Sequence, residues 1–210
     1  MKHLEFDLDE RQVTLLFSPI RSKMQVIALL MKTIKHMLVN YRLDNQLIKG
    51  KIVLKVSKMS RLFFISQDKV FSINFPFFVS DTNNELSFYS NDGHEVDSKV
   101  TSDVLSILTS DTVLNSGDVI AFADFICDIA DYNTGFWSLL RGLLLFEDGY
   151  IRYDYDEKYE NGFRHPLNHL DIFYGSGSTF KIGLRRSITQ DHLMDLLDLE
   201  TDCHFFENVR

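Results

Sequence analysis

The sequence predicts an α+β fold: an N-terminal helix with antiparallel strands, a helical middle, and C-terminal antiparallel β-strands followed by a helix. Two observations support this prediction. Apolar residues recur at helical spacing near the N-terminus, in the middle and at the C-terminus, and they alternate with polar residues in shorter runs between these segments. We expect the 210 residues to form a single α+β domain over 1–210. It can be subdivided into a basic helix-and-strand part (1–95) and a part with helices and the C-terminal sheet (96–210).

The clearest helix covers residues 24–41, where Ser22 can cap its start. The run 49–59 alternates, with apolar side chains on one face and mainly lysines on the other, which is typical of a strand. The runs 61–66 and 69–78 predict two further strands, with a turn at Gln67-Asp68.

The middle of the chain begins with a polar, turn-rich segment near residues 80–98, which predicts an exposed hinge. Its strongest turn signal is Asn91-Asp92-Gly93. Helical spacing follows in 99–110, in 116–132 with Ser116 as a cap, and in 134–146.

Three short alternating runs at 150–156, 169–174 and 179–184 predict the C-terminal strands, and 187–199 predicts the closing helix, with capping-box spacing at Ser187 and Gln190. Side chains alternate between the two faces of a strand. If the runs pair in one sheet, we expect their apolar faces to lie together against the helices. The opposite face then collects Arg152, Asp154, Asp156, His169, Asp171, Lys181 and, if the chain stays extended, His165.

One interpretation of this polar face is general acid–base catalysis, because histidine titrates near neutrality and a neighbouring carboxylate can orient it. One of two histidines would be the base or acid, and an arginine would hold a phosphate group. The candidate catalytic residues are His165, His169, Asp171, Asp154, Arg152 and Arg164.

Two other interpretations of the polar face stay open. His165, His169 and Asp171 have the composition of a two-histidine, one-carboxylate metal site, but Pro166 disfavours a helical pairing of the histidines. The face can also be solvated and carry only cross-strand ion pairs. Because Pro166 weakens the metal interpretation and the chain has no P-loop or dinucleotide-binding glycine motif, we expect neither a metal nor a cofactor.

The composition is that of a globular protein of the cytoplasm, with 45% hydrophobic and 25% charged residues and with two cysteines far apart in sequence. The N-terminus does not have the pattern of a signal peptide, and the apolar stretches are too short to cross a bilayer, so no membrane association is expected.

The net charge of −8 is unevenly distributed: residues 1–61 carry +7, and residues 62–210 carry −15. A basic contact surface on an acidic body would explain this, as would two parts of one fold that attract each other. For a nucleic acid or an acidic partner, the candidate contacts are Lys49, Lys51, Lys55 and Lys58.

The C-terminal third resembles a family of bacterial proteins known mainly as a domain of unknown function. The resemblance rests on the Asp-Tyr-Asp strand "YIRYDYD", the His-Pro-x-x-His step in "RHPLNHLDIFY", the run "FKIGL" and the closing helix "SITQDHLMDLL". It implies a bacterial cytosolic protein loosely associated with defence or toxin-like systems.

Two functions follow as expectations. The first is an intracellular accessory or effector protein of a defence-type system that acts through a protein partner, with nucleic acid as a further partner. The alternative is a small metal-independent nuclease or phosphate-ester enzyme that uses His165 or His169 with Asp171.

Overall fold

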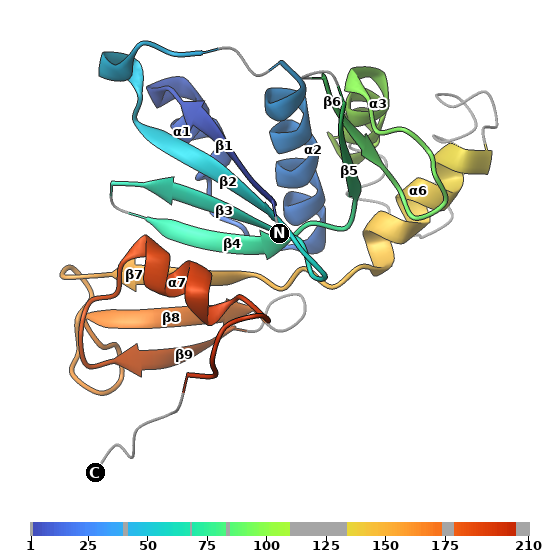
Figure 1. The fold of residues 1–210 in the computed structure, drawn as a ribbon. Helices are drawn as coiled ribbons and strands as arrows, with labels where there is room; N and C mark the ends of the chain where they lie inside the picture. The colour runs from blue at the N-terminus through green and yellow to red at the C-terminus, as the bar shows by residue number, and fades with distance from the viewer. Residues whose placement is uncertain are drawn as a thin grey trace.

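The computed structural model describes residues 2–39, 42–67, 69–82, 85–109, 134–173 and 179–204, and it shows an antiparallel sheet of seven strands with helices on both sides (Figure 1). In spatial order the strands are β1 (Lys2–Leu8), β2 (Gly50–Val56), β3 (Arg61–Ser66), β4 (Val70–Asn74), β7 (Ile151–Tyr155), β8 (Asn168–Phe173) and β9 (Thr179–Leu184). A separate hairpin pairs β5 (Phe78–Thr82) with β6 (Glu85–Tyr89). The helices are α1 (Glu10–Leu16), α2 (Lys23–Val39), α3 (Ser98–Thr109), α6 (Thr134–Leu145) and α7 (Gln190–Leu196), with a 3₁₀ helix at Asn45–Leu47.

This arrangement confirms the predicted α+β class. The seven-stranded sheet contains strands from both ends of the chain, because β4 pairs with β7, which follows the helical middle in the sequence. None of the described helices combines the length and apolar character that crossing a membrane requires.

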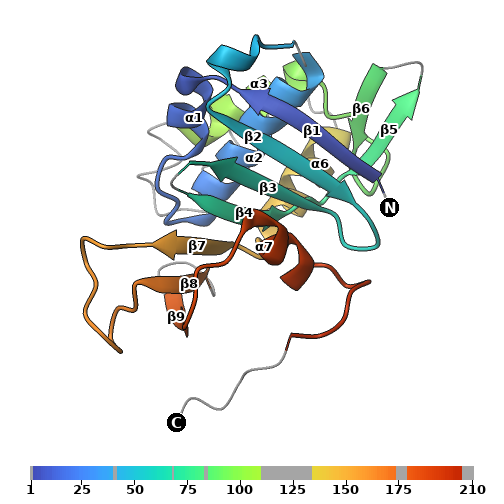
Figure 2. The same cartoon turned by 60° about the vertical axis from the view of Figure 1, so that its left-hand side comes forward.

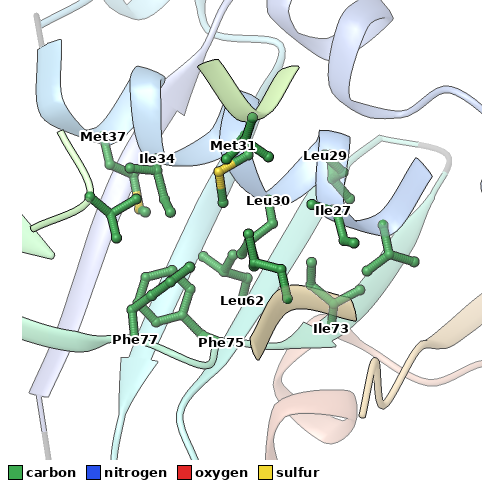
Figure 3. Close-up of a cluster of buried hydrophobic side chains, with 14 of the residues drawn as sticks. Ile27, Leu29, Leu30, Met31, Ile34, Met37, Leu62, Ile73, Phe75 and Phe77 are labelled. Atoms are coloured by element: carbon green, nitrogen blue, oxygen red, sulfur yellow. The ribbon is translucent and has the colours of Figure 1, made fainter. Parts of the chain in front are cut away.

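Helix α2 packs its apolar side on one face of the sheet and forms the main core. Because apolar residues recur every three or four positions, the helix can bury Ile27, Leu30 and Ile34 completely. Figure 3 shows Leu30 of α2 facing Leu62 of β3, with Phe75 and Phe77 beside them. Helices α3 and α6 contribute further buried residues to the same core.

The other face of the sheet is covered by α7, which is only seven residues long (Figure 2). Met194 of α7 and Leu197, which directly follows the helix, pack on a smaller apolar cluster formed by Val53, Phe63 and Ile65. A helix of two turns covers little of a seven-stranded sheet, so this second face is covered incompletely.

The register between β4 and β7 determines which side of the sheet the polar and the apolar side chains of β7–β9 occupy. Phe71 of the main core lies opposite Arg152, and paired residues of an antiparallel sheet point to the same side. The polar side of β7–β9 therefore continues the α2 face, and the apolar side lies on the α7 face. We expected the apolar side to lie against the helices. It does lie on the face of helix α7, where Leu170 is buried and the other aliphatic side chains are partly covered, but the polar side is not the uncovered one, because it continues the face on which α2 packs.

Several local predictions were incomplete. The alternation of Leu4, Phe6 and Leu8 with polar residues is a strand signal that we did not use for β1, and α1 was also missed. The predicted hinge contains the β5–β6 hairpin, although the turn at 91–93 is present, with Gly93 at φ 77°.

The predicted cap of the last helix was wrong. The capping box consists of Thr189 and His192 rather than Ser187 and Gln190, because the chain reaches helical geometry two residues later than the pattern suggested. At α2 the predicted Ser22 does accept a hydrogen bond from the Gln25 amide, at 3.3 Å. The Gln67-Asp68 turn is described only up to Gln67, and the predicted helix 116–132 lies outside the described residues.

The junction between β4 and β7 depends on Gly149, which has φ 55°. A Cβ atom at this position would lie 2.6 Å from the side chain of Asn74. We expect Gly149→Ala to lower the free energy of unfolding by about 1–3 kcal/mol, because alanine is strained at positive φ and would also displace Asn74. Urea denaturation measures this change. Gly142→Ala is the control, since a Cβ there has nothing within 4 Å. Equal denaturation midpoints for the two variants would contradict the role given to Gly149.

Candidate functional site

The polar side chains of β7–β9 form a cluster on the α2 side of the sheet. The strand register places Arg152 opposite Asp171, Asp154 opposite His169, and Asp171 opposite Lys181. The cluster predicted from side-chain alternation is therefore assembled by the structure. It is also more buried than we expected, since His169 is 0% exposed and the Asp171 side chain is 8% exposed. A solvated sheet face does not describe it.

Histidine 169 is held in one tautomer by its neighbours. Its Nδ1 lies 2.8 Å from the carbonyl oxygen of Pro166, which can only accept, so Nδ1 carries the proton. Its Nε2 then has a free electron pair and accepts a hydrogen bond from Lys181 Nζ at 3.0 Å. Oxygen atoms of Asp154 and Asp171 lie 3.7 and 3.8 Å from the same Nε2.

Arginine 152 donates hydrogen bonds to both carboxylates of the cluster. Its Nε and Nη2 donate to Asp154 at 2.5–2.8 Å, and its Nη2 also donates to Asp171 at 2.6 Å. Burial works to lower the pKa of Arg152, but the hydrogen bonds and charge of Asp154, aided by Asp171, outweigh it and raise the pKa. Because these donors are used inside the cluster, Arg152 is poorly placed to hold a phosphate group.

The second histidine belongs to the loop between β7 and β8. His165 Nε2 lies 3.0 Å from Asp156 Oδ2, and its ring meets the ring of His169 edge to face at 4.7 Å. Burial works to raise the pKa of Asp156, but the amide of Tyr159 and the His165 ring hold it below its ordinary value. Arg164 is exposed on the same loop, and its side chain makes no ion pair with the described residues.

The four candidate lysines of the N-terminal part do not form one free basic surface. Lys55 is buried and makes an ion pair with Asp198, and Lys51 pairs with Glu5 at 3.2 Å. Only Lys49 and Lys58 are exposed without a carboxylate partner among the described residues. The N-terminal excess of positive charge is thus used partly to attract acidic residues of the same chain.

Tyr150 separates the polar cluster from the apolar core. Its ring packs against Phe71 and Phe173, with centroids 5.6 and 4.4 Å away. Burial raises its pKa to about 12, although Arg152 works in the opposite direction.

An alkaline titration monitored by tyrosine absorbance should show one phenol with a pKa near 12 that is absent from Tyr150→Phe. An unfolded tyrosine ionises near pH 10, so the stability that the neutral phenol contributes is present below about pH 10 and is lost as the pH rises through 12. If the variant has the same titration curve as the wild type, this account of the burial of Tyr150 is wrong.

A groove of about 870 Å³ lies on the other side of the same strands, between β7–β9 and α7. Its floor is aliphatic. Leu170 is buried, whereas the other aliphatic side chains of the strands are only partly covered: Ile151, Ile172, Ile182 and Leu184. Leu196 and Leu197 of the α7 end and Ile188 complete the apolar lining.

The charged residues of this groove all belong to basic residue types. Arg185, Arg186, His192 and His204 line it, and none of its lining residues is acidic, although the chain carries a net charge of −8. His204 Nε2 lies 2.7 Å from Asp195 Oδ2 and His192 Nδ1 accepts a hydrogen bond from the Thr189 amide, so the positive charge of the rim comes mainly from the two arginines. Within the described part of the chain, neither Arg185 nor Arg186 has an ion-pair partner. The groove was not predicted, although its aliphatic residues were assigned correctly to one strand face. The Arg185-Arg186 pair after the third run was the signal that could have marked its rim.

Comparisons of the chain with protein-family models, with curated proteins and with solved structures give no match, which is consistent with a family of uncharacterised function.

Proposed function

We propose that the protein acts by binding a protein partner, and that the groove between β7–β9 and α7 receives an acidic segment of that partner with apolar side chains. The observation that carries this proposal is the combination of a partly covered aliphatic floor with a rim of arginine and histidine. Soluble proteins rarely leave a contiguous apolar surface of this kind uncovered unless it binds something.

The charge of the rim favours an acidic occupant. Two arginines without carboxylate partners in the described structure would bind Asp or Glu side chains, and arginine can do so through two parallel hydrogen bonds. The aliphatic floor would bury Leu, Ile or Phe side chains of the same segment. Apolar contacts would supply affinity, and the rim would set orientation and association rate.

The wider role follows from the resemblance of the C-terminal third. We assign the protein to the bacterial cytoplasm as an accessory or effector protein of a defence-type system. Nucleic acid is a second proposed partner with less support, because two of the four candidate lysines pair with carboxylates and the other two, Lys49 and Lys58, have no carboxylate partner among the described residues.

Selection of linear peptides displayed on phage, with the purified full chain as bait, tests the binding specificity of the groove. Enriched peptides should combine aliphatic or aromatic residues with Asp or Glu. Their affinity should fall at least about tenfold for Ile182→Asp, which places a carboxylate on the floor, and should fall with added salt. Leu47→Asp is the control, since Leu47 is exposed outside the groove. Peptides without this composition, or peptides that bind Ile182→Asp as well as wild type, would overturn the proposal, as would a selection without enrichment.

The phosphate-ester enzyme is a second candidate, favoured by the Asp156–His165 pair. A carboxylate that orients an imidazole is the arrangement that general base catalysis requires. The His165 ring also contacts the ring of His169, which in turn accepts a hydrogen bond from Lys181. It predicts hydrolysis of RNA by the purified chain that His165→Ala abolishes and Arg164→Ala weakens. Cleavage that survives His165→Ala would exclude this site as its source.

A further inference from the structure

A second binding site is suggested by the side chains around His169 Nε2. One oxygen of Asp154, one oxygen of Asp171 and this nitrogen all lie within 4.8 Å of one another. The cluster offers one imidazole and two carboxylates, a donor set that suits divalent transition metals.

The position between these three atoms is suited to a cation. Asp171 Oδ1 is buried and accepts no hydrogen bond from any described residue. Its nearest cation is Lys181 Nζ at 3.3 Å, and the same ammonium group donates to His169 Nε2. The lysine therefore places a positive charge where an imidazole nitrogen and a carboxylate oxygen converge.

Two neighbouring groups, the Pro166 carbonyl and Arg152, hold the three candidate ligands in place. The Pro166 carbonyl fixes the His169 tautomer so that Nε2 faces the cluster with its electron pair free for a metal. Arg152 donates to Asp171 Oδ2 and to both oxygens of Asp154, which keeps the two carboxylates close together and leaves Asp171 Oδ1 open toward this position. Outer contacts of these two kinds are typical of metal ligands in proteins.

We propose that Asp154, His169 and Asp171 form a binding site for a divalent transition-metal ion, for which the ammonium group of Lys181 competes. Lys181 is on β9, an edge strand, and its side chain is 33% exposed, so it can turn outward to solvent. Ligand atoms of a tetrahedral zinc ion lie about 3.4 Å apart. The distances from His169 Nε2 to the two carboxylates, 3.7 and 3.8 Å, therefore need to shorten by about 0.3–0.4 Å, and the distance between the two carboxylate oxygens, at most 4.8 Å, needs to shorten by about 1.4 Å or less.

The test measures Zn²⁺ binding by calorimetry and the metal content after dialysis. All proteins carry Cys203→Ser and His204→Gln, because an exposed thiol and an exposed imidazole also bind zinc. Lys181→Met removes the competing cation and should tighten binding of one Zn²⁺ at least about tenfold. Adding Asp154→Asn or His169→Asn to Lys181→Met should reverse this gain.

A second readout observes His169 itself. The ¹⁵N resonance of His169 Nε2 should shift when Zn²⁺ is added to Lys181→Met, while the resonance of Nδ1 stays that of a protonated nitrogen. Lys181→Gln serves as a second neutral variant if Lys181→Met does not fold. Equal zinc affinity with and without Lys181, or binding of one Zn²⁺ that leaves the His169 resonances unchanged, would overturn the proposal.

Discussion

Replacing Arg61 with alanine is expected to lower the free energy of unfolding by about 3–5 kcal/mol, the largest effect that we expect from a single substitution. Arg61 is buried on the α7 face and donates to three neutral acceptors: Ser72 Oγ at 3.0 Å, Asn74 Oδ1 at 2.5 Å, and the carbonyl oxygen of Gly149. Burial lowers its pKa to about 10, and no carboxylate of the described residues pairs with it. Alanine would leave these acceptors without their donor and would open a cavity.

The effect of Arg61 matters for the groove because its bonds join β3 and β4 to the start of β7. Chemical denaturation of Arg61→Ala, Arg61→Lys and Ser72→Ala separates the contributions. Lysine keeps the charge but cannot make three bonds in different directions, so it should recover only part of the loss. Ser72→Ala removes two hydrogen bonds, the one that Ser72 Oγ accepts from Arg61 and the one that it donates to the Leu62 carbonyl oxygen, and should cost about 1–3 kcal/mol. A loss below about 1 kcal/mol for Arg61→Ala would show that the junction is held by something else.

Replacing Asp171 with asparagine is expected to lower the free energy of unfolding by about 2–4 kcal/mol, because it removes a charge that two buried or half-buried cations share. Arg152 would keep only Asp154, and Lys181 would keep only His169. The double variant Asp171→Asn/Lys181→Met removes one charge of each sign and should recover part of this loss.

Urea denaturation of the two single variants and the double variant measures the coupling between Asp171 and Lys181. Glu157→Gln, an exposed carboxylate on the neighbouring loop, is the control and should leave the midpoint unchanged. Additive effects of Asp171→Asn and Lys181→Met would contradict the view that the cluster is one neutral network.

The spacing of apolar residues in the sequence predicted much of the fold, because this spacing indicates both whether a segment is a helix or a strand and which of its faces is buried. The alternation in β7, β8 and β9 correctly placed Arg152, Asp171 and Lys181 on one side of the sheet. It could not show which side of the sheet the helices would cover, since that depends on the pairing of Phe71 with Arg152 across the helical middle.

The charge pattern was harder to interpret because its partners are distant in sequence. Lys55 looked like part of a basic outer face, but its partner Asp198 is 143 residues away and both side chains are almost fully covered. An ion pair between residues so far apart in the sequence cannot be inferred from the residues around either partner. The same limit explains why the cluster around His169 was expected at the surface and the groove was not expected at all.

We propose that β7–β9 bind a partner through the apolar, basic-rimmed groove. The most direct test places a photo-crosslinking amino acid at position 182 in living cells, with position 163, which is 99% exposed, as control. We expect an adduct from position 182 and none from position 163. The crosslinked partner segment should contain apolar and acidic residues, and the adduct should be lost in Arg185→Glu/Arg186→Glu. An adduct that persists in that double variant, a segment without carboxylates, or no adduct specific to position 182 would contradict the account.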